Sequence, residues 1–238
     1  ARDIQQSFLR QDPVVAPGLD IAFLNIPSST VGGDYYEVMP LDDRETVFSV
    51  CDVAGHGVPA ALGMAIFRSS FIHRLRQDRD IAAATVHVNR LLAETTEASL
   101  YVTAFACKVD ANAGLLDYVN AGHPPPLVAR GAEALWLDEG GMAVGMFADA
   151  EFRPVRFRLQ PGDVLALYTD GVIEAANDRG EEYGRERLAA AVSAGRRLPA
   201  AGLQAALLAD VRAFCGRDEF ADDLTLMVVK YLGKTDLP

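Results

Sequence analysis

The chain has 238 residues, of which 50% are hydrophobic, and its formal net charge is −11. This apolar content is enough for one well-packed domain. The acidic balance, without any Lys/Arg cluster, argues against a nucleic-acid or anionic-membrane partner. Three scattered cysteines argue against a disulfide framework, and no apolar run is long enough to span a membrane. Together these features predict a cytoplasmic protein.

The first residues predict a short linker helix over 1–12, in which Ile4 and Phe8 lie four residues apart with Leu9 beside them. The chain does not begin with Met, which suggests a piece of a longer protein. The helix is therefore expected to pack on the domain, to connect it to an upstream sensor or receiver domain, or to form a homodimer. No long linker divides residues 13–238, which are expected to form one domain.

Apolar alternation and helical spacing predict the remaining elements. In chain order we expect strands at 20–24, 35–39 and 46–50, helices at 57–76 and 81–91, strands at 101–109, 115–120, 127–129, 134–137, 155–159 and 164–168, helices at 185–194 and 200–215, and a strand at 224–229. Helices in pairs and strands in antiparallel runs indicate an α+β fold rather than βαβ alternation. The Met and Phe stripe of the first long helix is interpreted as core.

Four Asp residues each stand where an apolar strand is expected to end: Asp34, Asp52, Asp170 and Asp222. Carboxylates at strand ends can converge at one edge of a sheet, where they repel one another unless a cation lies between them. Hard divalent cations such as Mg²⁺ and Mn²⁺ prefer such an all-oxygen site. A single Asp-Gly pair is more often a turn. The set of four, in contrast, predicts a metal site.

The segments that contain these residues resemble the SpoIIE-type branch of the metal-dependent protein phosphatases, the PPM family with the type 2C fold. The matching segments are GGDYY at 32–36, DVAGHG at 52–57, NAGHPP at 120–125, TDGVIEA at 169–175 and DDLTL at 222–226. They cover nearly the whole chain after residue 13, in family order. The resemblance implies a four-layer αββα sandwich, in which two antiparallel sheets lie face to face between helix pairs.

The resemblance also implies two Mn²⁺ or Mg²⁺ ions. Asp52 would bridge both ions, and the backbone carbonyl of Val53 would add a ligand. Asp34 and Asp170 would hold one ion, directly or through water, and Asp222 would complete that site.

One ligand is left open between two neighbours, Asp222 and Asp223. The wider family has Asp-Asn at this point, which favours the first residue. Glu37 is expected to assist through water.

The catalytic residues implied are Asp52 and His56. His56 follows Asp52 on a loop and could protonate the leaving seryl oxygen, or could simply shape that loop. His123, between Gly and Pro, is interpreted as a turn residue. The Arg that grips phosphate in the eukaryotic branch has no clear counterpart before Gly32, so the phosphate grip stays unassigned.

The expected function is that of a phosphoserine/phosphothreonine protein phosphatase, the output domain of a bacterial signalling protein. By resemblance its substrate would be a phosphorylated anti-sigma-factor antagonist of the STAS type. The alternative is an adaptor of the same fold that binds a sigma factor or its regulator without catalysis, which should show damaged metal ligands. A nucleotide cyclase is disfavoured because Tyr35-Tyr36 replaces the Glu-Phe expected after Gly-Gly-Asp, and an aspartyl-phosphate phosphatase because no Asp-x-Asp follows a strand.

Overall fold

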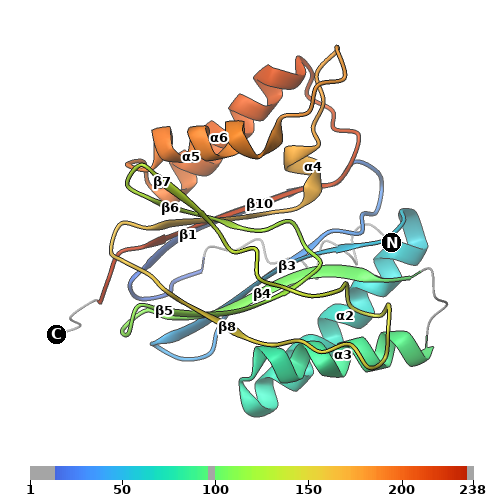
Figure 1. Ribbon diagram of the computed structural model, residues 1–238. Coiled ribbons are helices and arrows are strands. Elements are labelled where there is room, and N and C mark those ends of the chain that lie inside the picture. Colours follow the sequence, from blue (N-terminus) through green and yellow to red (C-terminus); the bar gives the residue numbers. More distant parts are fainter. Residues whose placement is uncertain (1–13, 96–99, 235–238) are drawn as a thin grey trace.

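The computed structural model describes residues 14–95 and 100–234, and the expected helix over 1–12 lies outside them. Within the described residues, two five-stranded antiparallel sheets pack face to face (Figure 1). A pair of helices covers the outer face of each sheet. The α+β class and the four-layer αββα sandwich predicted from the sequence are confirmed.

Sheet A lies under the C-terminal helices. In spatial order its strands are β1 (Leu19–Ile26), β10 (Leu224–Tyr231), β9 (Val164–Tyr168), β6 (Leu127–Arg130) and β7 (Glu133–Trp136), and its helices are α5 (Gly184–Gly195) and α6 (Ala200–Cys215). The sequence did not predict α4 (Asp170–Ile173), a single turn directly after β9.

Sheet B carries the N-terminal helix pair. Its strands are β2 (Tyr35–Pro40), β3 (Glu45–Val53), β4 (Val102–Asp110), β5 (Leu115–Ala121) and β8 (Val155–Arg158), and its helices are α2 (Gly57–Asp78) and α3 (Ile81–Thr95). Consecutive strands β2 to β5 are neighbours, as expected for an antiparallel meander.

The core has three apolar layers, which explains why β9 is apolar throughout and β10 carries apolar residues on both faces. In β10, Met227 and Val229 pack between the two sheets, whereas Leu226 and Val228 pack under the helices. Successive side chains point to opposite faces of a strand, and here both faces are covered.

The stripe on α2 packs against sheet B, as expected of core residues. Phe67 and Phe71 stack with ring centroids 5.5 Å apart, and Met64 and Leu75 belong to the same buried layer. Full burial of such side chains stabilises the fold by roughly 1.5–3 kcal/mol each. Within residues 14–95 and 100–234, no helix combines the length and apolarity needed to cross a membrane.

Candidate active site

Two of the four Asp residues meet at one edge of sheet B. Asp52 is the second-last residue of β3, and Asp34 directly precedes β2. The expectation that each Asp follows a strand is therefore wrong for Asp34. The two residues still converge because β2 and β3 are antiparallel, so that Tyr35 pairs with Cys51 and the start of one strand lies beside the end of the other.

The other two meet at the corresponding edge of sheet A. Asp170 lies two residues after the end of β9, and Asp222 lies two residues before β10. The expectation that Asp222 follows a strand is also wrong. Antiparallel pairing again explains the convergence, because Leu226 pairs with Tyr168 and brings the start of β10 to the end of β9.

Asp34 joins the two sheets at this edge. Its carboxyl group is buried, and Oδ2 accepts hydrogen bonds from the hydroxyls of Thr169 (2.7 Å) and Thr225 (2.6 Å) in sheet A. Asn25 donates to the Thr225 hydroxyl, which directs the Thr225 proton towards Asp34. Burial and the negative charge of Asp52 raise the pKa of Asp34 well above its usual value.

The neighbours Asp222 and Asp223 differ in environment. Asp223 is 7% exposed: Oδ1 accepts bonds from the Ser28 backbone N–H (2.8 Å) and hydroxyl (3.0 Å), and Oδ2 accepts one from the Gly33 N–H (2.8 Å). A Cβ at Gly32 would lie 2.1 Å from Asp223 Oδ2, so only glycine permits this approach. Asp222 is exposed, and its Oδ1 accepts the Asp223 N–H at 2.7 Å. Asp223 thus holds the loop before β2 in place through hydrogen bonds, and the side chain of Asp222 stays exposed to solvent.

The carboxylates at this edge repel one another. Burial, followed by the charges of Asp170, Asp222 and Asp223, raises the pKa of Asp52 to about 7. Burial and the charge of Asp222 also raise the pKa of Asp170. The charged groups that act most strongly on Asp52 are all carboxylates, and a bound cation would reduce the repulsion between them.

Glu174 belongs to the same acidic edge, which comprises Asp52, Asp170 and Asp222, although no motif in the sequence pointed to it. It follows α4, and burial together with the charges of Asp170, Glu182 and Asp222 raises its pKa.

The oxygen atoms around Gly33 fit a hard divalent cation. A Cβ at Gly33 would lie 2.8 Å from the Val53 carbonyl oxygen and 3.3 Å from Asp52 Oδ1, so both oxygens face the space that the missing side chain leaves. Among the described residues, no group of three or more His, Cys, Asp or Glu side chains is arranged so that it could hold a metal ion. Carbonyl and carboxylate oxygens are the donors that a hard divalent cation such as Mg²⁺ or Mn²⁺ prefers.

Glu37 points to the helix layer. Its carboxylate accepts a hydrogen bond from the Tyr35 hydroxyl and lies 3.8 Å from the Arg68 guanidinium on α2. These contacts account for the buried Glu37 without the water-mediated role that the sequence suggested.

His56 is one of the residues that line a large hollow. It is exposed at the N-cap of α2, and its side chain makes no capping hydrogen bond. Together with Ser28, Thr30 and Asp222 it lines a hollow of about 700 Å³. The ring is therefore within the same cavity as a candidate ligand and is accessible to a substrate.

His123 has a structural position that its loop setting did not reveal. It is 4% exposed, its Nε2 donates to the Tyr168 carbonyl at 3.0 Å, and its Nδ1 accepts from the Thr103 hydroxyl at 2.9 Å. Burial lowers its pKa to about 4, so the ring is neutral near pH 7. Thr103 pairs with Asp52 across β3 and β4, and Tyr168 lies two residues before Asp170. His123 thus cross-links the two sheets beside the acidic edge.

Comparison with known proteins gives consistent matches over most of the chain. The family model described as Stage II sporulation protein E (SpoIIE) matches residues 42–232. Phosphoserine phosphatase RsbU of Bacillus subtilis is 26% identical over 183 residues, covering 76% of this chain and 54% of RsbU. Phosphoserine phosphatase RsbP of the same organism is 31% identical over 187 residues, covering 73% of this chain and 44% of RsbP. The chain therefore spans about half the length of these two relatives.

Among solved structures, the SiaA-PP2C domain of Pseudomonas aeruginosa is similar to this fold. It superimposes with a TM-score of 0.80 at 26% identity, covering 89% of this chain and 85% of that one. The similarity therefore extends over most of both chains.

Proposed function

The chain belongs to the SpoIIE family, and from that premise we propose that it is a Mn²⁺- or Mg²⁺-dependent protein phosphatase that hydrolyses phosphoserine and phosphothreonine. The observation that supports this most is the acidic edge, where the carboxylates of Asp52, Asp170 and Asp222 repel one another and favour a bound cation. A non-catalytic adaptor would have no use for these repelling carboxylates, and the residues that the family resemblance selects are all present.

We assign the ligands of the two ions as follows. Asp52 would hold both ions, and the Val53 carbonyl, which faces the same space in front of Gly33, would add a ligand. Asp34 and Asp170 would hold one ion, directly or through water, and Asp222 would complete that site. When bound, such ions supply Lewis acidity that activates water and offset the charge on phosphoryl oxygens.

Asp223 is not a ligand in this proposal. Both of its oxygens accept hydrogen bonds from the loop before β2, whereas the exposed Asp222 makes only a local bond to the next backbone N–H. This division supports the first Asp of the pair as the ligand.

His56 is the proposed general acid. It would donate a proton to the seryl or threonyl oxygen that leaves, which requires an accessible ring in the substrate cavity. Its exposed position on the wall of the large hollow, which Asp222 also lines, meets that requirement.

The substrate we propose is a phosphorylated STAS-type anti-sigma-factor antagonist. RsbU and RsbP are named phosphoserine phosphatases, and this chain matches about half of each. We therefore also propose that residues 13–238 are the output domain of a longer signalling protein, which residues 1–12 would connect to an upstream sensor or receiver domain.

The test is hydrolysis of an aryl phosphate and of a phosphoserine peptide, with Asp52→Asn as the inactive control. We expect both activities to require added Mn²⁺ or Mg²⁺ and to stop with chelator. Full activity after exhaustive chelation would refute the metal mechanism. A correctly folded protein that binds metal and peptide but hydrolyses neither the aryl phosphate nor the phosphoserine peptide would favour the adaptor.

A further inference from the structure

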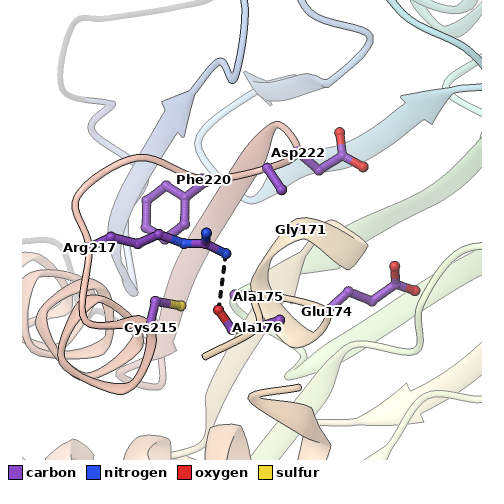
Figure 2. Close-up of a pocket in the computed structure, with 9 residues that line it drawn as sticks. Gly171, Glu174, Ala175, Ala176, Cys215, Arg217, Phe220 and Asp222 are labelled. Carbon is purple, nitrogen blue, oxygen red and sulfur yellow. Dashed lines mark hydrogen bonds between the residues drawn. The ribbon is translucent and has the colours of Figure 1, made fainter. Parts of the chain in front are cut away.

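A second, smaller pocket lies beside the candidate active site, between α4 and the end of α6 (Figure 2). Its volume is about 210 Å³, the scale of one side chain. Ala221 and Asp222 line both this pocket and the large hollow that contains His56. A peptide segment that crosses Asp222 can therefore place one side chain in each.

The lining of the small pocket combines apolar groups with one cationic and two acidic side chains. Cys215 is buried in its wall, and Phe220 contributes an aromatic ring. Figure 2 shows the Arg217 side chain running past Phe220, with its guanidinium donating to the Ala176 carbonyl at 3.2 Å. One bond leaves most of the five N–H donors of a guanidinium for another acceptor.

The charges around the pocket are separated. The carboxylates of Asp222 and Glu174 lie on the side away from Arg217 in Figure 2. In the described part of the chain no carboxylate lies within 4.0 Å of the Arg217 guanidinium, and the adjacent Asp218 pairs with Arg212 at 3.6 Å. Arg217 is also the only Lys or Arg among the described residues that line either hollow. The end of the pocket at Arg217 therefore favours an anion.

We propose that this pocket receives a glutamate side chain of the phosphoprotein substrate, a few residues from the phosphorylated one. The inference rests on the proposed phosphatase function and specifies its substrate class. The aliphatic part of glutamate would pack on Phe220 and Cys215, and its carboxylate would pair with Arg217, which can bind a carboxylate through two N–H groups. A purely apolar side chain would leave the guanidinium without its partner.

The test uses phosphoserine peptides that carry a single Glu at one position from −3 to +3, each compared with its Gln counterpart. We expect kcat/KM to favour Glu about three- to fivefold at one or two positions, the range of a partly exposed ion pair. Arg217→Ala should abolish this preference, and Arg217→Glu should reverse it, so that Gln is favoured over Glu. Hydrolysis of an aryl phosphate, which has no flanking residues, should stay within about twofold in both variants.

Arg44→Glu is the matched charge control. Arg44 directly precedes β3, eight residues before Asp52, which places it about 26 Å from the acidic edge along the strand. The Glu preference should survive in this variant, because the net charge changes equally but the pocket does not.

Binding separates this inference from the proposed function. Fluorescence anisotropy of labelled peptides with Asp52→Asn in Mn²⁺ measures the Glu preference without turnover. A Glu preference that depends on Arg217, found together with a wild-type protein that hydrolyses no phosphate ester, would refute the function and keep the pocket. A Glu preference that persists in Arg217→Ala would overturn the inference. An equal loss on peptides and aryl phosphate would overturn it as well, because Arg217 would then grip the phosphoryl group.

Discussion

Replacing Asp222 and Asp223 by Asn, one at a time, should give opposite results although the residues are adjacent. In Asp223→Asn, the side-chain amide must turn its NH₂ towards either Ser28 or Gly33, because backbone N–H groups face both oxygens. One charge-assisted hydrogen bond is lost and a buried donor is left without an acceptor, at a cost of about 2–3 kcal/mol. Loss of a charge that repels Asp52 offsets part of this.

For a domain of this size, that cost lowers the melting temperature by about 4–12 °C. Asp222→Asn should leave the melting temperature of the metal-free protein unchanged or slightly higher, because the side chain is exposed and its charge repels Asp52 and Asp170. Metal at roughly 100 times its Kd stabilises a folded protein by about 2.7 kcal/mol. We expect this gain in the wild type and in Asp223→Asn, and its loss in Asp222→Asn.

The assay is thermal unfolding by circular dichroism in chelator and again with excess MnCl₂, alongside aryl phosphate hydrolysis. The assignment of Asp222 as the ligand is refuted if Asp223→Asn keeps its metal-free stability but loses the response to Mn²⁺, whereas Asp222→Asn loses stability and keeps the response. That result would make the buried residue the ligand and the exposed one structural.

Three further predictions concern the same edge. The raised pKa of Asp52, about 7, means that the folded metal-free protein binds a proton more tightly than the unfolded chain, so this contribution to stability is present at low pH and is lost as pH rises to about 7. The stability difference between wild type and Asp52→Asn, measured by urea unfolding in chelator, should follow that direction, whereas saturating Mn²⁺ should stabilise the wild type alone. The pKa of His123 is lowered to about 4, so its contribution to stability has the opposite pH dependence: it is present above pH 6.5 and is lost as pH falls towards 4. His123→Ala should therefore be less stable than wild type by about 2–4 kcal/mol above pH 6.5, and the difference should narrow at lower pH. A constant difference across this range would contradict a buried neutral ring. His56→Ala should lower turnover of a phosphoserine peptide by roughly 10²-fold and affect an aryl phosphate much less, because an aryl leaving group needs little protonation; equal losses on both substrates would argue against the acid role.

The sequence by itself determined the elements and the residue types of the candidate site. Apolar strands with both faces covered, and helices with an apolar stripe such as Phe67 and Phe71, follow from patterns that are local in the chain. The four Asp residues and the glycines near them were also visible, because their motifs are short and contiguous. For these features the relevant partners lie within a few residues.

The tertiary structure alone decided how these residues are used. Asp34 meets Thr225 across 191 residues of sequence, and which end of each strand reaches the edge depends on antiparallel pairing that no local pattern records. Asp222 and Asp223 are the same residue type at adjacent positions, yet Asp222 is exposed and Asp223 is buried against a loop 195 residues away. His123 has the local signature of a turn residue and nevertheless bridges both sheets. In each case the long-range packing of the two sheets sets the burial and the hydrogen-bond partners of the side chain. These determine whether a polar residue is free to bind a ligand, holds a loop in place or links the two sheets.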